Sequence, residues 1–544
     1  MSSLIDKILA SRGIAASDME EFLHPDYGKR HDPFLLPDMK KAVDRIELAL
    51  KNKENITIYG DYDIDGLTAT AVLLDALKSF GFQDVKAFIP NRFVEGYGLT
   101  VDAIESIAET GANLIITVDC GSLSHKEIER ANELGVDVIV TDHHSVSDVH
   151  PDAVAVINPK RTDHDYPFID LAGVGVAFKL VQALQTRLDG LSTGAEKWML
   201  DLVALGTVCD VVTLIDENRT NVYWGLEVLK KTRRPGLRAL MAVSRVDKHN
   251  LNSRSLGFAL GPRMNASGRL ETAQYALDML TTSDSNRALE LAQKLDEMNL
   301  DRRSQQDAIM KEAVIQAEKF DTDPVLVVSG VGWNHGIIGI VAAKLLEKYK
   351  KPTFVLEEMG ELAKGSARSY GDFSAVEAIR AADDIIIKGG GHKLAAGVNM
   401  KTENIDKFRV RLNEFYKSKD YKNQSDLLLP REDAEASLDE VDLELIDKIK
   451  DLEPFGNGNP DPILRTNNLK VAARRVMGSD GQHVKYSLRD EKGSVIDLIA
   501  FNQAHEFNSS VGETVNVWYQ PTLNEWNGTR KVEGFLKNIQ TLNQ

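Results

Sequence analysis

The chain has 544 residues, of which 43% are hydrophobic and 27% charged, and its formal net charge is −17. This length exceeds what one hydrophobic core supports, so we expect roughly two to four domains, and apolar runs too short to cross a bilayer exclude a membrane-spanning protein. The excess negative charge excludes a protein that coats nucleic acid through bulk positive charge, but it leaves open a nuclease with a local basic groove.

The first residues and the cysteines indicate the compartment. The N-terminus, Met-Ser-Ser-Leu-Ile-Asp, lacks the basic and apolar regions of a signal peptide. Cys120 and Cys209 each lie in an apolar segment. We expect two buried thiols in the reducing cytoplasm, in preference to a disulfide.

The first half of the chain alternates strands and helices. Residues 1–52 show mixed helical patterns, and the alternation begins at Asn55. The expected strands are 56–59, 85–89, 114–118, 136–140 and 154–157, and the expected helices are 67–80, 102–110 and 126–134. Such alternation predicts a parallel sheet with helices on both faces, which binds ligands beyond the carboxyl ends of its strands.

The second half predicts further domains. Residues 172–245 read as helical, and 287–320 form a charged helical pattern without Pro or Gly, suited to an arm between domains. A second α/β block begins at Pro324, with strands at 325–328 and 353–356 around a helix at 337–349. After a polar linker, five strand-like runs predict a small barrel such as an OB-fold: 469–476, 483–488, 495–501, 514–520 and 531–536. The predicted divisions are 1–52, 53–285, 286–322, 323–416, 417–434 and 435–544.

Three carboxylates follow the first strand. Residues 60–66 read Gly-Asp-Tyr-Asp-Ile-Asp-Gly, so Asp61, Asp63 and Asp65 alternate and point the same way in an extended backbone. Like charges brought together repel unless a cation lies among them, and hard divalent cations prefer oxygen ligands. The alternative is a polar turn in which Asp65 lies near the N-cap of the following helix.

Further candidate ligands follow other apolar segments. Asp119 ends one strand, Asp142, His143 and His144 follow another, and Asp210 follows an apolar helix. Of the two histidines, one can bind metal while the other faces substrate. Such a set suits two divalent ions ~3.5–4 Å apart, a device for phosphoryl transfer. Mixed Asp and His ligation favours Mn²⁺, with Mg²⁺ also suitable, and the absence of clustered cysteines argues against structural zinc.

The order of these motifs resembles the DHH phosphoesterase family. Four later segments are similar to the bacterial RecJ group of that family, with its DHHA1 domain: Gly-Pro-Arg-Met-Asn-Ala-Ser-Gly-Arg-Leu at 261–270, Gly-Ser-Ala-Arg-Ser at 365–369, Gly-Gly-Gly-His at 389–392 and Glu-Pro-Phe-Gly-Asn-Gly-Asn-Pro at 453–460. The resemblance runs from about residue 50 to the end. It implies two α/β domains, DHH with a parallel sheet and then DHHA1, joined by a long helix and followed by a β-barrel OB-fold.

The resemblance also implies an activity and a ligand set. It implies a 5′→3′ exonuclease that degrades single-stranded DNA to mononucleotides in recombination and repair, acting as a monomer beside a single-stranded-DNA-binding protein and a helicase. The implied metal ligands are Asp61, Asp63, Asp65, Asp119, His143 and Asp210, although the Asp61 slot is often His elsewhere in the family. His144 would act beside the scissile phosphate, together with Asp119 and His143 as the catalytic set.

Arginines and glycines in the later motifs suggest phosphate binding. Arg263 and Arg269 flank an expected turn at 265–268 that begins with Asn265, and Ser366 and Arg368 stand two apart. Arginine donates two hydrogen bonds to phosphate at once, although isolated arginines are usually surface residues. The resemblance implies a 5′-phosphate site, and the residues predicted to bind substrate are Arg92, Arg263, Asn265, Arg269, Ser366, Arg368, Gly391 and His392.

The tail combines basic and aromatic residues, as OB-folds that bind a single strand do. The basic residues are Arg474, Arg475, Lys485, Arg489, Arg530 and Lys531. We expect Tyr486 and Trp518 in the barrel core and Trp526 exposed in a hairpin. The tail should therefore hold the strand and contribute no chemistry.

Two other functions are compatible with parts of this pattern. A phosphodiesterase for very short oligonucleotides or cyclic dinucleotides needs the same metals but no strand-binding tail. A non-enzymatic binding module that keeps the fold should have lost some ligands, whereas this chain carries the whole set.

Overall fold

The computed structural model describes residues 3–96, 98–419, 421, 429–526 and 528–542. Two compact units are formed, one from residues 1–90, 94–261 and 430–544 and the other from 91–93 and 262–429. The first unit therefore contains both the first α/β domain and the tail. Among the described residues, no helix combines the length and apolar character needed to span a membrane.

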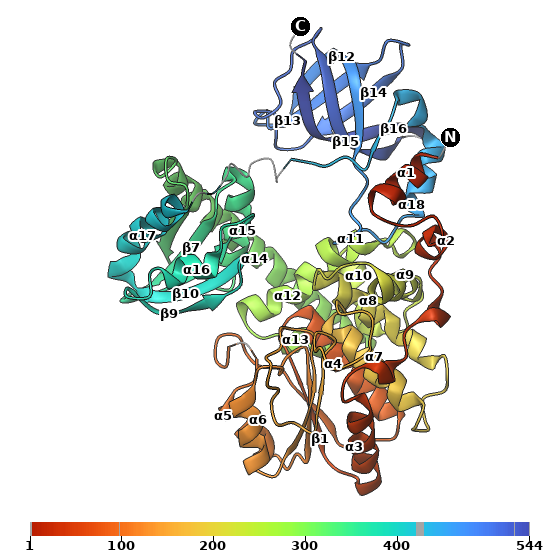
Figure 1. Cartoon of the computed structure of the whole chain (residues 1–544), viewed down its shortest axis with the longest axis vertical. Helices are drawn as coiled ribbons and strands as arrows, with labels where there is room; N and C mark the ends of the chain where they lie inside the picture. Colours follow the sequence, from red (N-terminus) through yellow and green to blue (C-terminus); the bar gives the residue numbers. More distant parts are fainter. Residues whose placement is uncertain (1–2, 97, 420, 422–428, 527, 543–544) are drawn as a thin grey trace. The chain divides into compact units, whose positions relative to one another are not determined.

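The first unit is built on a five-stranded parallel sheet with strand order β2-β1-β3-β4-β5. Figure 1 labels β1 of this sheet. Its strands are β1 (Ile56–Gly60), β2 (Val85–Phe88), β3 (Leu114–Val118), β4 (Asp137–Thr141) and β5 (Ala155–Ile157). Every residue of β1 and β3 is buried, as their continuous apolar, β-branched sequences predict. The strand order reverses between β1 and β3, and in such sheets that point is where ligands bind.

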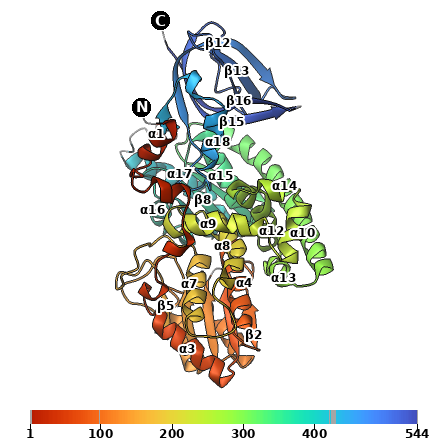
Figure 2. The same cartoon turned by 90° about the vertical axis from the view of Figure 1, so that its right-hand side faces the viewer.

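Helices cover both faces of this sheet, as Figure 1 shows, and Figure 2 looks onto one of these faces. Successive strand residues point to opposite faces, and Tyr59, Ile115 and Val138 pack with helices α5 and α6. The opposite face carries α4 and α7, and α8 packs on both of them. These helices are α4 (Ile64–Ser79), α5 (Val101–Glu109), α6 (His125–Glu133), α7 (Gly173–Gln185) and α8 (Leu200–Cys209).

Further helices complete the unit. They are α1 (Leu4–Ser11), α2 (Met19–Leu23), α3 (Met39–Asn52), α9 (Asp216–Leu229), α10 (Pro235–Val243) and α11 (Ser253–Ser255). A single π-helical turn, Leu256–Leu260, follows α11.

The tail forms a closed barrel, confirming the predicted OB-fold. Its sheet order is β11-β12-β13-β14-β16-β15, and the pairing of β12 with β15 closes it. The elements are β11 (Ala434–Glu435), α18 (Leu443–Lys450), β12 (Leu464–Met477), β13 (His483–Arg489), β14 (Val495–Ala500), β15 (Thr514–Trp526) and β16 (Thr529–Thr541). Four residues of α1, namely Leu4, Ile5, Ile8 and Leu9, belong to the barrel's hydrophobic core. The N-terminal helix is therefore part of the tail's packing.

The second unit contains a mixed sheet and a long helix. The strand order is β6-β7-β8-β10-β9. The strands are β6 (Leu326–Val331), β7 (Thr353–Met359), β8 (Leu362–Arg368), β9 (Ile386–Gly391) and β10 (Ala395–Lys401). The helices are α12 (Gly261–Leu270), α13 (Gln274–Thr281), α14 (Ser285–Lys319), α15 (Ile338–Tyr349), α16 (Ala375–Arg380) and α17 (Ile405–Ser418). As predicted, α14 is one continuous helix of 35 residues.

One local prediction is wrong. The expected turn at 265–268 lies inside α12, because Met264, Ala266 and Ser267 are buried against the fold and tertiary packing outweighs the low helix propensity of Gly and Asn. The Gly-rich segment before His392 forms the end of strand β9. Much of the linker predicted at 417–434 lies outside the described residues, which omit 420 and 422–428.

The aromatic residues of the tail are partly as predicted. Tyr486 is fully buried, which confirms its core position. Trp518 is only half-buried and donates to Glu432, whereas its neighbour Tyr519 is fully buried. Val515, Val517 and Tyr519 are buried on one face of β15, so regular alternation places Tyr519 in the core and points Trp518 away from it. The side chain of Trp526 lies outside the described residues.

Candidate metal centre and phosphate-binding cluster

The three carboxylates after β1 are held in different ways. Asp63, rather than Asp65, is the N-cap of α4 and accepts hydrogen bonds from the N–H groups of Asp65 and Gly66 at 2.9 and 3.1 Å. Asp65 is buried in the first turn of α4 and accepts from the N–H groups of Gly173 and Val174 at 2.6 and 2.8 Å. These donors begin α7, whose N-terminal dipole favours an anion. Backbone donors thus orient Asp63 and Asp65.

Asp119 lies in the left-handed region, with φ 61°, directly after β3. It is 1% exposed, and neither carboxylate oxygen accepts a hydrogen bond from a described residue. A Cβ at Gly173 would lie 2.7 Å from Asp119 Oδ1, so glycine is required there to make room for the carboxylate. The strained backbone conformation of Asp119 directs its carboxylate toward the carboxyl end of the sheet.

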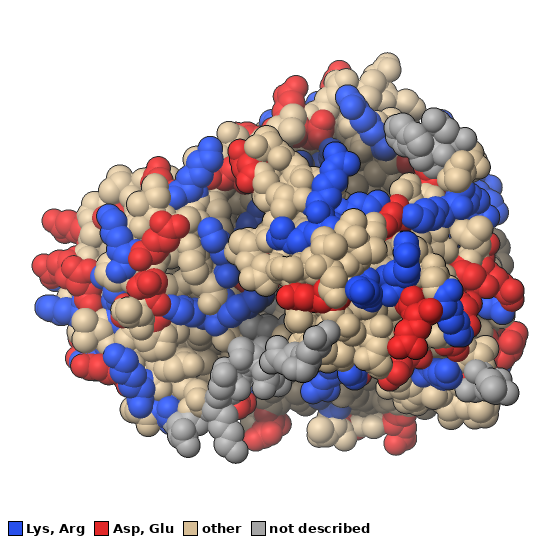
Figure 3. All heavy atoms as spheres, turned by 90° about the horizontal axis from the view of Figure 1, so that it is seen from above, with Lys and Arg blue, Asp and Glu red and all other residues tan. Residues whose placement is uncertain are grey.

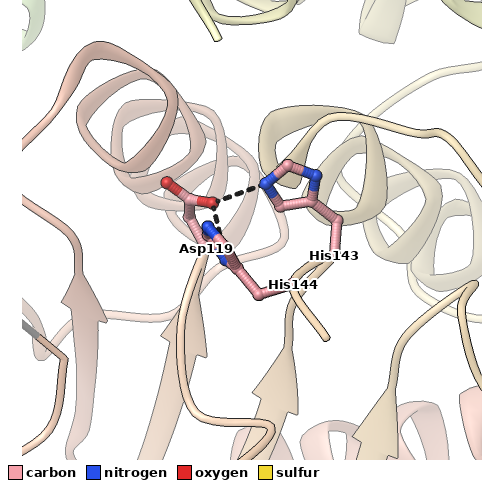
Figure 4. A group of neighbouring side chains, drawn as sticks. All are labelled: Asp119, His143 and His144. Carbon is pink, nitrogen blue, oxygen red and sulfur yellow. Dashed lines mark ion pairs between the residues drawn. The ribbon is translucent and has the colours of Figure 1, made fainter. Parts of the chain in front are cut away.

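His143 lies among carboxylates from three segments of the chain. Its Nε2 is 3.1 Å from Asp119 Oδ1, 3.5 Å from Asp210 Oδ2 and 3.8 Å from Asp65 Oδ2. The contact with Asp119, drawn in Figure 4, is close in distance but lacks hydrogen-bond geometry. Ligand atoms of Asp61, Asp63 and Asp119 also lie within 4.8 Å of one another. The structure therefore brings together all six residues predicted to bind metal.

Asp142 is the functional residue that sequence reasoning did not assign. Its Oδ1 accepts from the N–H of His143 at 2.7 Å, and from the N–H and ring Nδ1 of His144 at 3.0 and 2.9 Å. Its Oδ2 accepts from the N–H of Ser122 at 2.9 Å. Asp142 therefore fixes the turn that carries both histidines. In the sequence, the position of Asp142 directly before two histidines and after an apolar strand indicated such a role.

The electrostatics of this cluster oppose its full ionisation. Burial, followed by the charges of Asp210 and Asp63, raises the pKa of Asp65 well above its usual value. Burial and neighbouring carboxylates likewise raise the pKa of Asp119 well above its usual value and that of Asp210 to about 7. Burial lowers the pKa of His143 to about 3, so this ring is neutral. The cluster thus combines several carboxylates with a neutral imidazole.

This donor set fits divalent cations. A buried carboxylate with no donor, such as Asp119, is costly unless it is paired or coordinates a metal. Carboxylate oxygens suit Mn²⁺ and Mg²⁺, and one neutral imidazole makes Mn²⁺ the better match. Neither cysteine belongs to the groups of side chains close enough to share an ion.

A second cluster lies in the second unit, at the start of α15. Ser366 and Arg368 face the same way on β8, with 3.3 Å between Ser366 Oγ and Arg368 Nη1. A Cβ at Gly339 would lie 3.0 Å from Ser366 Oγ and 3.2 Å from Arg368 Nη2, so glycine lets α15 approach both side chains. Burial lowers the pKa of Arg368, and no carboxylate of a described residue lies within ion-pair distance of it. A partly buried guanidinium without a carboxylate beside a helix N-terminus suits an anion.

Arg269 and Arg92 belong to the same region of the second unit. Arg269 Nη1 donates to the carbonyl of Gly336, just before α15, at 2.9 Å. The charge of Arg92 helps to lower the pKa of His335, although burial is the larger cause, and the ring of Phe93 packs on His335 at 5.0 Å. These contacts bring Arg92 and Arg269 near the segment that precedes α15.

The other residues predicted to bind substrate have local roles in the structure. Arg263 pairs with Asp296 at 2.7 Å, and Asn265 is half-buried in α12. Gly391 has φ 139°, and a Cβ there would lie 2.6 Å from the carbonyl oxygen of Ala395. Strand pairing therefore explains this glycine without a ligand, while His392 is exposed in the turn between β9 and β10.

Most basic residues nominated in the tail are paired within the protein. Arg474 donates to the Tyr486 hydroxyl and to a backbone carbonyl, and Lys485, Arg530 and Lys531 lie within 3.2 Å of carboxylates. Arg475 and Arg489 are exposed and make no hydrogen bond or ion pair with a described residue. Lys and Arg side chains are interspersed with Asp and Glu over the coloured surface in Figure 3. Of the six nominated residues, Arg475 and Arg489 are therefore the ones best placed to meet a strand.

The comparisons with known proteins divide the chain into similar domains. Three family models match: the DHH family N-terminal domain at 55–207, the DHHA1 domain at 322–418 and the RecJ OB domain at 432–538. A Bacillus subtilis protein described as single-stranded-DNA-specific exonuclease RecJ is 39% identical, with 99% of this chain and 68% of that protein covered. The crystal structure of RecJ with Mn²⁺ from Thermus thermophilus has a TM-score of 0.81 and 29% identity, covering 99% of this chain and 76% of that one. The Mg²⁺ complex of the same protein has a TM-score of 0.77 and 28% identity, covering 99% and 74%.

Proposed function

The chain belongs to the RecJ family of single-stranded-DNA-specific exonucleases, and we propose that it degrades single-stranded DNA from the 5′ end to mononucleotides with two divalent cations. The observation that carries this proposal is the group of carboxylates around the neutral His143, at the point where the strand order of the sheet reverses. Recombination and repair are the processes in which such an activity would serve.

The residues that would hold the cations are Asp61, Asp63, Asp65, Asp119, His143 and Asp210. Two divalent cations supply an activated water and neutralise charge at the phosphate. Asp119 contributes a carboxylate whose two oxygens are both available within the cluster. The N–H groups of Gly173 and Val174 keep Asp65 in place while cations exchange.

His144 acts on the substrate side of the cluster. Burial tends to lower its pKa, but the hydrogen bond to Asp142 and the charges of Asp142, Asp210 and Asp61 together outweigh burial and raise it. With Nδ1 directed at Asp142, the opposite ring nitrogen would donate to a phosphate oxygen or a leaving group. The side chain is 42% exposed, so substrate can reach it.

The 5′ direction would come from the second cluster. Arg269, Ser366 and Arg368 would bind the terminal phosphate, with Arg92 contributing charge. The contact between Ser366 and Arg368, and the absence of a carboxylate at Arg368, support this assignment. Arg263, Asn265, Gly391 and His392 remain weaker candidates, for which the local contacts give no ligand-specific reason.

The barrel would add affinity for a longer strand, and this separates the proposal from a phosphodiesterase for dinucleotides. On the family resemblance, we propose further that the enzyme acts as a monomer beside a helicase and a single-stranded-DNA-binding protein. The deciding experiment is digestion of a long single strand labelled at either end, with and without Mn²⁺. Mn²⁺-dependent early release of the 5′ label is expected, whereas early release of the 3′ label or faster cleavage of a dinucleotide would refute the proposal.

A further inference from the structure

The residue after Asp210 has an unfavourable backbone conformation. Asp210 is the C-cap of α8, and Val211 follows it with φ 62°. A helix commonly ends with a residue in this left-handed conformation, but that residue is usually Gly or Asn, because a β-branched side chain is strained there. Val211 is 64% exposed, so packing of its side chain does not hold the conformation.

A loop of the tail forms hydrogen bonds with the segment that contains Val211. Asn457 Nδ2 donates to the carbonyl of Val211 at 3.0 Å, and the N–H of Leu214 donates to the carbonyl of Asn457 at 2.7 Å. One residue, 246 positions away in sequence, thus bridges both ends of the short segment that leaves Asp210. Within the catalytic domain, the N–H of Val211 donates to the carbonyl of Val208 at 3.3 Å and Asn218 donates to the carbonyl of Thr213 at 3.0 Å. Among the described residues, only Asn457 donates to the carbonyl of Val211.

Glycines on both sides of Asn457 permit this approach. A Cβ at Gly456 would lie 2.6 Å from Leu214 Cδ1, so any side chain there would push the loop away. Gly458 has φ 76°, and a Cβ there would meet Thr213 at 3.4 Å. The loop is therefore shaped to the segment that follows Asp210.

The loop is also anchored on its far side. The buried Asn459 donates to the carbonyls of Leu452 and Pro454 at 2.8 and 2.9 Å. The buried Arg219 of α9 donates to the carbonyl of Glu453 at 2.9 Å. These bonds make the loop a fixed support against which Asn457 can act.

We propose that Asn457 is a positioning residue that holds Asp210 in its metal-binding orientation by stabilising the strained Val211. This inference rests on the proposed role of Asp210 as a metal ligand. It deepens the proposed function, because the tail then contributes to the metal centre as well as to strand binding. Residues that support metal ligands typically change metal affinity by 10–100-fold when they are replaced.

The test measures Mn²⁺ binding by titration calorimetry on the full chain without DNA, together with the thermal unfolding midpoint. Asn457→Ala should weaken Mn²⁺ binding about tenfold. Asn508→Ala is the matched control, because Asn508 is an exposed tail residue whose side chain makes no hydrogen bond to a described residue. Asp210→Asn should weaken binding at least as much as Asn457→Ala.

A second substitution distinguishes positioning from a structural role. Glycine adopts positive φ without strain, so adding Val211→Gly to Asn457→Ala should restore most of the Mn²⁺ affinity that the single substitution removes. A lower unfolding midpoint with unchanged Mn²⁺ affinity, or a weakening that Val211→Gly does not reverse, would overturn the inference. Undisturbed Mn²⁺ binding in Asp210→Asn, or none in the unsubstituted protein, would overturn the proposed ligand set and this inference with it.

Discussion

Oδ1 of Asp142 lies 2.9 Å from Nδ1 of His144 and also accepts the N–H of that residue. This one oxygen of Asp142 therefore fixes both the backbone conformation at His144 and the orientation of its ring. Asp142→Asn should lower kcat by roughly 10–100-fold, because supporting partners of this kind cost that much when they are removed. Mn²⁺ affinity should change less, since His144 is outside the proposed ligand set.

Single-turnover rates at saturating Mn²⁺ would check this prediction. If Asp142 acts through His144, the double variant Asp142→Asn/His144→Ala should be no slower than His144→Ala alone. Asp152→Asn is a suitable control because this carboxylate is exposed. Additive losses in the double variant would show that Asp142 has a separate role.

Replacing Asp119 should have opposite effects on stability with and without metal. Its carboxylate is buried beside like charges, so Asp119→Asn should raise the unfolding midpoint of the metal-free protein by about 2–4 °C for each kcal/mol of repulsion removed. The same variant should lose hydrolysis and most of the stabilisation by Mn²⁺, which reaches about 2.7 kcal/mol at a hundred times Kd. Scanning calorimetry with and without Mn²⁺ measures both effects, and full activity would contradict the ligand assignment.

Arg368 should determine the preference for a 5′-phosphate. Charge-assisted contacts are worth ~1.5–3 kcal/mol, so Arg368→Ala should lower kcat/KM roughly ten- to a hundredfold on strands with a 5′-phosphate. The loss should be much smaller on strands with a 5′-hydroxyl. Arg411→Ala is the control, because Arg411 pairs with Asp384 on the surface of the same unit. An equal loss on both substrates would assign Arg368 another role.

Local sequence predicted the strands and the acidic cluster because short-range physics decides both. The strand β3 has the predicted bounds, since its five apolar residues are all buried. Asp61, Asp119 and His143 meet because parallel strands bring their carboxyl ends to one edge of the sheet. The helix around Asn265 was missed because propensity is a weak guide where tertiary packing decides.

Long-range contacts account for what the sequence did not predict. Asn457 and Val211 are adjacent only in the folded chain, and no local pattern links them. The packing of α1 into the barrel core was also not predicted. The apolar face of α1 indicates that the helix is buried, but it does not indicate which domain it packs against.

Asp497 should make the barrel sensitive to acid. Burial tends to raise its pKa, but hydrogen bonds from Lys531, Ser487 and Lys485 outweigh this and lower the pKa to about 2. Because the folded pKa lies below the unfolded one, the stabilisation is complete above about pH 4 and is lost as the pH falls toward 2. The unfolding midpoint of Asp497→Asn should therefore lie below that of the unsubstituted protein at pH 6, with a difference that narrows by pH 3. A difference independent of pH would contradict this cause.

The barrel's contribution to strand affinity should depend on Arg475 and Arg489, which are exposed and have no ion-pair partner among the described residues. Replacing both by alanine should weaken binding of a long single strand and flatten the log–log salt dependence by roughly 0.7 for each phosphate that is no longer neutralised. Substitution is a cleaner test than deletion of the tail, because deletion would also uncover α1 and remove the loop around Asn457.

Binding would be measured at several salt concentrations by fluorescence anisotropy, in Ca²⁺ to prevent cleavage. Lys531→Ala is the matched control, since Lys531 lies 2.7 Å from Asp497 and its charge is already compensated. The double variant should keep the kcat of the unsubstituted protein at saturating DNA, because neither arginine belongs to the proposed metal or phosphate clusters. If affinity and salt slope were unchanged, the barrel would bind the strand through another surface, and the assignment of these two arginines would be wrong.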